Sequence, residues 1–183
     1  MDFRDHSKLA GAHAFLSPSK YHWVNYDLDK LEARYRTALA AQRGTKLHSI
    51  AHDLITEGIN LPDNGKTMSL YVNDAIGYKM VSEQVLYYSP MAFGTADTIC
   101  FRKNKLRIHD LKTGTTSTSV WQLLILAAFF CLEYGIKPFD IETEVRIYQN
   151  DDFVAWIADP DEITHLMDKI QTFVKYLMER EAL

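Results

Sequence analysis

The chain has 183 residues, of which 47% are hydrophobic and 24% are charged, as is typical of a folded globular protein and not of a disordered one. This length predicts a single well-packed domain over residues 1–183. The net charge of -4 is unlike that of a general nucleic-acid coat protein, but it does not exclude an enzyme whose acidic side chains hold a divalent metal ion.

Neither membrane insertion nor secretion is expected. The longest apolar run, residues 123–132, is too short to cross a membrane, and the first residues lack the apolar core of a signal peptide. The two cysteines, Cys100 and Cys131, are far apart in the sequence, which argues against a disulfide framework or an iron–sulfur cluster. We therefore expect a cytoplasmic protein with no membrane partner.

The N-terminal segment is polar over residues 1–13, which we expect to be loosely ordered. Ser17 or Ser19 can then cap a short helical turn. An aromatic cluster follows, which either packs this segment onto the core or stacks on nucleic-acid bases. Its members are Tyr21, His22, Trp23 and Tyr26.

Two helices are predicted next, separated by a break. Residues 27–42 are rich in helix-forming side chains and contain no proline. Residues 43–45 include Gly44 and are expected to end this helix, so that Thr45 caps a second helix over residues 46–56. A loop over residues 57–66 follows, because this stretch is rich in glycine, proline, asparagine and aspartate.

The second of these helices carries His48 and His52, which are four residues apart and so share one face. This spacing suits zinc, but no nearby cysteine or third histidine completes a ligand set. A structural role, with each imidazole partly buried and hydrogen-bonded, is the simpler interpretation of the residues alone.

Residues 67–80 have a roughly helical period, and residues 83–88 predict the first strand. Glu83 either adds a carboxylate to a site or lies at the sheet edge. Residues 93–101 and 106–111 are rich in strand-forming side chains and flank a polar turn, which predicts a β-hairpin.

The predicted hairpin places two carboxylates together. If its turn is centred on Lys103 and Asn104, Asp97 lies opposite Asp110, with Cβ atoms roughly 5 Å apart. Lys112 is two residues beyond Asp110 and so points to the same face. Facing carboxylates repel each other, and their oxygens suit Mg²⁺ or Mn²⁺. The alternative is a solvent-facing hairpin whose charges form surface pairs.

Hydroxyl groups after Lys112 can hold a phosphate at the start of the next helix. Thr113 and Thr115 are the candidates, and simple capping by Ser117 or Thr118 is the alternative. The helix over residues 119–134 is apolar nearly all round and is expected to be buried. Gln122 is a polar exception in its first turn, and a buried amide needs hydrogen-bond partners.

The remaining elements complete the predicted fold. Residues 141–148 and 153–157 predict strands, and residues 161–180 predict an amphipathic helix. The fold class is therefore α/β, with a mixed, mainly antiparallel sheet of four or five strands and flanking helices.

Two stretches of the chain resemble a known family. Residues 94–97, GTAD, and residues 110–114, DLKTG, resemble the RecB-type branch of the PD-(D/E)XK nuclease superfamily. The resemblance extends from about residue 17 to residue 148 and implies a restriction-endonuclease-like core. It also implies that Asp97 and Asp110 hold Mg²⁺ or Mn²⁺, with His48 as a further ligand and the Leu111 carbonyl as another.

The resemblance further implies that Lys112 assists the attacking water or the transition state, and that Gln122 orients the lysine or the phosphate. The family usually has a tyrosine where this chain has Leu126. The expected function is metal-dependent cleavage of DNA, by exonuclease action in recombination, repair or phage DNA processing. The enzyme acts alone or together with recombination or repair proteins, and an oligomeric state is one of the expected forms. The alternatives are a catalytically silent binding module on the same fold and a hydrolase of small phosphate esters.

Overall fold

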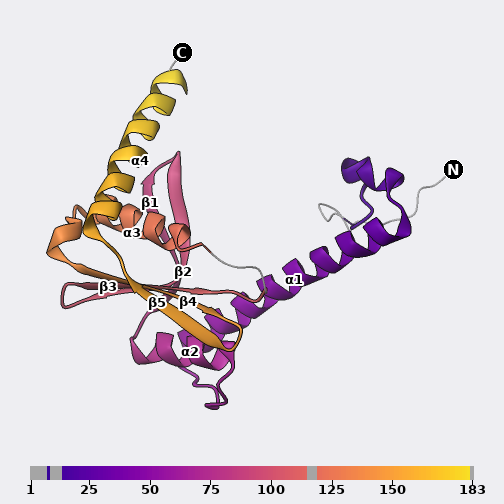
Figure 1. Cartoon of the computed structure of the whole chain (residues 1–183), viewed down its shortest axis with the longest axis horizontal. Coiled ribbons are helices and arrows are strands. Elements are labelled where there is room, and N and C mark those ends of the chain that lie inside the picture. The colour runs from indigo at the N-terminus through magenta and orange to yellow at the C-terminus, as the bar shows by residue number, and fades with distance from the viewer. Residues whose placement is uncertain (1–7, 9–13, 115–118, 182–183) are drawn as a thin grey trace. The chain divides into compact units, whose positions relative to one another are not determined.

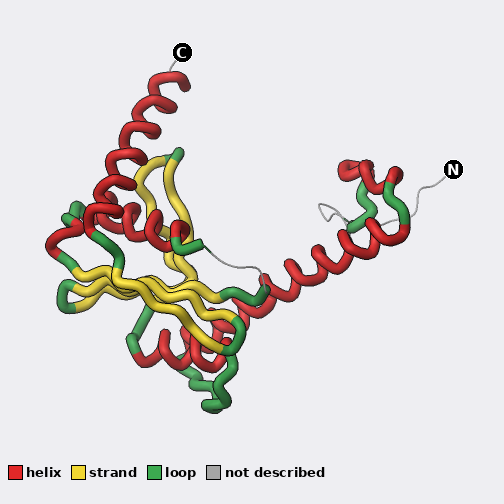
Figure 2. The backbone as a smooth tube through the Cα atoms, in the orientation of Figure 1, coloured by secondary structure: helices red, strands yellow, loops and turns green. Residues whose placement is uncertain are grey.

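The computed structural model describes residue 8, residues 14–114 and residues 119–181. The chain divides into two compact units, residues 1–45 and residues 46–183. Figure 1 shows the chain from end to end, and Figure 2 shows its helices and strands. Most of the N-terminal residues expected to be loosely ordered, 1–7 and 9–13, lie outside the description.

The first unit contains the short 3₁₀ helix η2 (Pro18–Asn25) and the beginning of the long helix α1 (Leu28–Glu57). Asp27 caps α1, because its Oδ1 accepts the N–H of Lys30 at 2.8 Å. Ser17 occupies the N-cap position of η2 but makes no capping bond. Its hydroxyl is instead 2.9 Å from that of Ser19, so the predicted cap is wrong.

The aromatic cluster of this unit has two environments. The indole N–H of Trp23 donates to the carbonyl of Ser17 at 3.0 Å, and Trp23 is half-buried, as is Tyr26. Tyr21 is 62% exposed, and its ring lies 4.5 Å from that of His22 between centroids. Packing therefore accounts for Trp23 and Tyr26, but not for Tyr21 and His22.

The predicted break at Gly44 is wrong, because α1 is continuous from Leu28 to Glu57. One glycine in a helix costs only about 1 kcal/mol, which the strong helix formers around it offset. Thr45 does not cap a new helix; its Oγ1 donates to the carbonyl of Ala41 one turn earlier. The loop predicted over residues 57–66 is found over residues 58–66, since α1 ends at Glu57 and α2 begins at Thr67.

The second unit is built on a five-stranded mixed sheet in the order β1-β2-β3-β4-β5. Strands β3 and β4 are parallel, and the other neighbours are antiparallel. The predicted α/β class is therefore confirmed. The strands are β1 (Val81–Ser89), β2 (Ala92–Arg102), β3 (Lys105–Leu111), β4 (Glu142–Gln149) and β5 (Asp152–Ile157).

Helices cover both faces of this sheet (Figure 1). Helix α3 (Trp121–Tyr134) and helix α4 (Pro160–Glu181) lie on one face, and α2 (Thr67–Gly77) lies on the other. The short 3₁₀ helix η3 (Pro138–Asp140) joins α3 to β4, and Gly135, with a φ of 65°, ends α3. Along the described residues, no helix is both long and apolar enough to cross a membrane.

Two apolar cores follow from these layers. The larger one packs α3 and α4 against the sheet, with Ala127, Ile108 and Val145 fully buried. The smaller one packs the end of α1 and α2 against the opposite face, around Val72 and Tyr148. Because successive strand residues point to opposite faces, β3 and β4 each contribute side chains to both cores.

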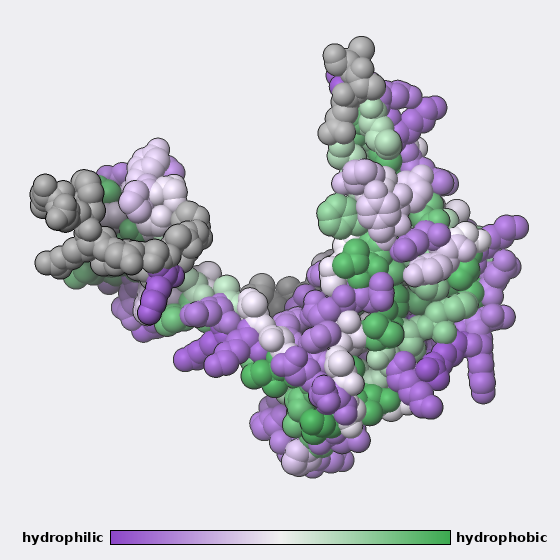
Figure 3. Space-filling view, turned by 180° about the vertical axis from the view of Figure 1, so that it is seen from behind, coloured by the Kyte–Doolittle hydropathy of each residue, from purple (hydrophilic) through white to green (hydrophobic). Residues whose placement is uncertain are grey.

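The predicted apolar face of α4 is only partly covered. Ile163 and Val174 are buried, but Phe173 is 56% exposed and Leu177 is 44% exposed. In the space-filling view, apolar residues reach the surface among charged ones (Figure 3).

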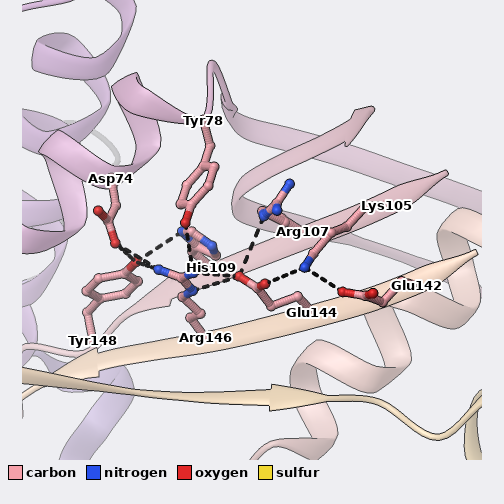
Figure 4. A network of polar contacts seen from close by, with 9 residues as sticks. All are labelled: Asp74, Tyr78, Lys105, Arg107, His109, Glu142, Glu144, Arg146 and Tyr148. Atoms are coloured by element: carbon pink, nitrogen blue, oxygen red, sulfur yellow. Dashed lines mark hydrogen bonds and ion pairs between the residues drawn. The ribbon is translucent and has the colours of Figure 1, made fainter. Parts of the chain in front are cut away.

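A polar network occupies the sheet face beneath α2 (Figure 4). The guanidinium of Arg146 donates to Glu144 at 2.8 Å, to Asp74 at 3.0 Å and to the Tyr78 hydroxyl at 2.9 Å. Burial lowers the pKa of the neighbouring His109 to about 3, and the charge of Arg146 contributes to this shift. His109 is therefore neutral at physiological pH and acts as a packing residue.

Candidate metal and phosphate site

The β2–β3 hairpin has the predicted register. Ile99 pairs with Ile108 across a turn at Lys103 and Asn104, whose φ values are 52° and 57°. Two positive φ values are typical of the tight turn that joins antiparallel strands without splaying them. The paired residues end at Thr98 and His109, one step before Asp97 and Asp110.

At that next step the bond between the two strands joins a backbone N–H of β3 to a side chain of β2. The Oδ2 atom of Asp97 accepts the N–H of Leu111 at 2.9 Å, so Asp97 binds the end of β3 through its side chain. The amine of Lys112 donates to Oδ1 of Asp110 at 2.9 Å. The structure thus brings Asp97, Asp110 and Lys112 together at the end of the hairpin, as the sequence predicts. The contact from Leu111 is its amide, and the role expected of its carbonyl stays a prediction.

Asp110 is buried with half of its carboxylate unpaired. The residue is 3% exposed, and within the described part of the chain its Oδ2 atom has no hydrogen-bond partner. Burial raises the pKa of Asp110; the hydrogen bond from Lys112 opposes this rise, and the charge of Asp97 adds to it. A buried carboxylate oxygen without a partner is costly, so this position favours either a proton or a cation.

Asp97 has a similar environment. Burial raises its pKa, while the Leu111 N–H, His48 and Lys112 favour the ionised form. Two neighbouring carboxyl groups are therefore both hard to ionise in the protein without a bound cation. A divalent ion would offset both the burial and the mutual repulsion.

The two histidines of α1 have different neighbours. Nδ1 of His48 lies 3.4 Å from Oδ2 of Asp97, and the His48 side chain is 29% exposed. Nδ1 of His52 lies 2.7 Å from the hydroxyl of Ser82 at the start of β1. His48 therefore faces the carboxylates, whereas His52 joins α1 to the sheet. This arrangement agrees with the structural interpretation of His52, and metal ligation by His48 stays a prediction.

Glu83 also lies at this site, although the sequence assigned it no role. One ligand atom from each of His48, Glu83 and Asp97 lies within 4.8 Å of the others. Ser82 pairs with Thr98 and Gln84 with Ala96, so the step between them sets Glu83 opposite Asp97.

The backbone of Glu83 is in the left-handed region, with a φ of 55°. This conformation costs a residue other than glycine about 1–2 kcal/mol. The sequence gives only a weak signal for a role of Glu83, because a glutamate at the start of an edge strand is common and the sequence does not show which residue it faces.

Gln122 contacts the site from the first turn of α3. Its Oε1 lies 3.4 Å from the amine of Lys112, so the lysine lies between Gln122 and Asp110. The expectation that Gln122 is buried is wrong, because its side chain is exposed. Among the described residues, its hydrogen-bond partner is Lys112, and the buried residues of α3 begin at Leu123.

Leu126, which replaces the family's usual tyrosine, belongs to the larger core and is 5% exposed. It packs beneath β2, where a Cβ atom at Gly94 would lie 3.5 Å from its Cδ2.

The hydroxyl residues after Lys112 are only partly described. Thr113 is exposed, and Thr115, Ser117 and Thr118 lie outside the described residues. At the start of α3, the hydroxyl of Ser119 accepts the N–H of Trp121 at 3.3 Å.

Comparisons with protein-family models, with curated proteins and with solved structures give no match for this chain. The interpretation of the site therefore depends on its own residues and their geometry.

Proposed function

We propose that this chain is a metal-dependent deoxyribonuclease that hydrolyses phosphodiester bonds, of the RecB-type PD-(D/E)XK kind. The observation that carries the proposal is the buried, half-unpaired carboxylate of Asp110, beside Asp97 and bonded to Lys112. A surface hairpin with ordinary ion pairs would leave these acids in water, where repulsion costs little.

The residues present fit a divalent metal ion. The carboxylates of Asp97 and Asp110 supply oxygen donors, and the imidazole of His48 supplies a nitrogen donor beside them. Mg²⁺ and Mn²⁺ both accept carboxylate oxygens, and Mn²⁺ also tolerates imidazole. A bound ion would also give the orphan Oδ2 of Asp110 a partner. Glu83 offers a further carboxylate from the opposite strand.

When bound, such an ion polarises a phosphoryl oxygen and lowers the pKa of a bound water. The other roles belong to the chain itself. Lys112 presents a positive charge whose position is fixed by Oδ1 of Asp110 and Oε1 of Gln122. A cation held in this way stabilises the charge that grows on the phosphate oxygens in the transition state.

Neighbouring groups position the substrate in this proposal. Gln122 is exposed and so can reach a phosphate while it holds Lys112. The hydroxyl of Thr113 is exposed one residue beyond Lys112, where it can donate to the same phosphate. The resemblance extends the proposal to an exonuclease acting in the cytoplasm in recombination, repair or phage DNA processing.

A cleavage assay tests the proposed function. Purified protein is incubated with linear and circular DNA, single- and double-stranded, in Mg²⁺, Mn²⁺ or chelator. We expect metal-dependent cleavage that Asp110→Asn abolishes. The matched control is Asp140→Asn, since Asp140 is exposed on η3. Cleavage that persists in chelator or in Asp110→Asn would refute the proposal, as would the absence of cleavage by a folded protein that contains metal.

A further inference from the structure

A cavity of about 280 Å³ opens beside Lys112, on the side of the site next to the β4–β5 turn. This is slightly below the range of about 300–1,000 Å³ for drug-sized ligands, so it suits a single ring system. The described residues that line it are Leu47, Thr67, Met68, Leu111, Lys112, Thr113, Gly114, Asn150 and Asp151.

The lining combines apolar and polar groups. Leu47, Met68 and Leu111 come from α1, α2 and β3, and they provide apolar surface from three elements. Thr113 and Asn150 add a hydroxyl and an amide, which can both donate and accept hydrogen bonds. A site that combines apolar surface with hydrogen-bonding groups suits a flat ring with polar edges.

The charged groups of this lining are already compensated. The carboxylate of Asp151 accepts the Lys66 amine at 2.7 Å and the Thr67 N–H at 3.1 Å. The amine of Lys112 is bonded to Asp110 at 2.9 Å. Because both charges are already paired within the protein, neither is left to bind a charged ligand, so the chemistry favours a neutral occupant.

The walls are also held in place. The Asp151 carboxylate accepts the first N–H of α2, and the Asp151 N–H donates to the Thr67 hydroxyl at 2.7 Å. The β4–β5 turn is therefore fixed to the N-terminus of α2, across 84 residues of sequence. A preformed cavity binds a ligand without first paying the entropy of ordering its walls.

We infer that this cavity receives the base of an unpaired nucleotide next to the phosphodiester bond at Lys112. The inference rests on the proposed function, because Lys112 borders both the cavity and the candidate site. A base in a duplex is stacked and its edges are paired, so it must leave the helix to enter a cavity. The expected substrate is therefore a single strand or a frayed end.

Two variants test this inference, each with a matched control. Leu47→Trp fills the cavity from a side chain that is 37% exposed, and Ile50→Trp makes the same change at a neighbouring position that is 41% exposed and does not line the cavity. Asn150→Gly removes the amide at a φ of 55°, which glycine adopts freely. Its control, Asn104→Gly, removes an amide at a φ of 57° in the β2–β3 turn, away from the cavity lining.

The readout is 2-aminopurine fluorescence in single-stranded oligonucleotides, titrated with folded protein in chelator, beside cleavage of the same oligonucleotides in Mn²⁺. We expect one position of the strand to brighten on binding. Leu47→Trp should abolish this signal and weaken binding about tenfold, as expected from the loss of one base contact. Asn150→Gly should reduce the signal, and both controls should behave as wild type.

The outcomes separate the two proposals. If wild type cleaves DNA but Leu47→Trp and Asn150→Gly match their controls, base binding is refuted and the nuclease stands. If nothing is cleaved but the fluorescence change is lost only in Leu47→Trp, base binding stands and the nuclease is refuted. The absence of any 2-aminopurine change with wild type also refutes base binding.

Discussion

Nδ1 of His48 lies 3.4 Å from Oδ2 of Asp97, at the point where β2 approaches the end of β3. One turn later on the same helix, His52 is instead 2.7 Å from the hydroxyl of Ser82. Two histidines four residues apart on one helix thus have different partners, and substitutions at each should have different effects.

We expect His48→Ala to weaken Mn²⁺ binding at least tenfold, since even the outer partners of metal ligands contribute about 10–100-fold. The fold should remain intact, because the imidazole is part-exposed. His52→Ala should lower the free energy of unfolding by about 1–2 kcal/mol through the lost Ser82 bond and packing. The measurements are Mn²⁺-dependent melting temperature and chemical denaturation. The opposite pattern would exchange the two roles.

Lys112→Ala should reduce single-turnover cleavage by about 10²–10³-fold, as the loss of one transition-state donor does. DNA affinity and metal binding should change little, because the lysine acts on charge that develops during the reaction. Lys175→Ala, at an exposed position on α4, is the control. Unchanged cleavage with weakened DNA binding would remove Lys112 from the chemistry.

Asp110→Asn should stabilise the protein in chelator at neutral pH. The pKa of Asp110 is raised in the folded state, so its contribution to stability is present at low pH and is lost as pH rises through the folded pKa. Asparagine carries no charge to bury and keeps an acceptor for Lys112. Each kcal/mol gained should raise the melting temperature by about 2–4 °C.

The same variant should lose the stabilisation that Mn²⁺ gives to wild type. Melting curves between pH 4 and pH 8, with and without Mn²⁺, measure both effects. If Asp110→Asn is less stable than wild type in chelator at every pH, the acid is held by partners other than a metal ion.

Glu144→Gln should lower the free energy of unfolding at pH 7 by about 1–3 kcal/mol, the cost of leaving buried partners unpaired. Glu144 is buried and ion-paired with Lys105 at 2.9 Å and with Arg146 at 2.8 Å. Burial opposes its ionisation, but the Lys105 bond and the charge of Arg146 outweigh burial, and the pKa of Glu144 is lowered.

This stabilisation is present above the pKa of the unfolded chain and is lost as pH falls through the folded pKa. The difference between Glu144→Gln and wild type should therefore shrink in acid. Denaturation at several pH values tests this expectation, with Glu179→Gln, at an exposed position on α4, as the control. A difference that does not depend on pH would mean that Glu144 contributes by packing and not by charge.

Glu83→Gly should relieve the strained φ of 55° and leave stability in chelator equal to wild type or up to about 1 kcal/mol higher. It should also reduce the stabilisation by Mn²⁺, since a carboxylate near Asp97 is lost. Lys79→Gly is the matched control, at a φ of 54° outside the site. Equal Mn²⁺ responses from the two variants would exclude Glu83 from metal binding.

Much of the fold was predictable because its signals are local. The alternation of residues 106–111 and the turn at Lys103 and Asn104 together set the register of the hairpin. Gly44 shows the limit of such signals, because helix α1 continues through it. A glycine lowers the stability of a helix by about 1 kcal/mol, and the hydrogen bonds of neighbouring turns decide whether that cost ends the helix.

The sequence by itself determined that Asp97, Asp110 and Lys112 gather at one end of a hairpin, because strand period and turn geometry act over a few residues. Tertiary structure alone decided that His48 and not His52 faces Asp97, that Glu83 lies opposite Asp97, and that Asp151 lines a cavity beside Lys112. These contacts join segments that are distant in the chain. They depend on how helices and strands pack, which no local pattern of residues specifies.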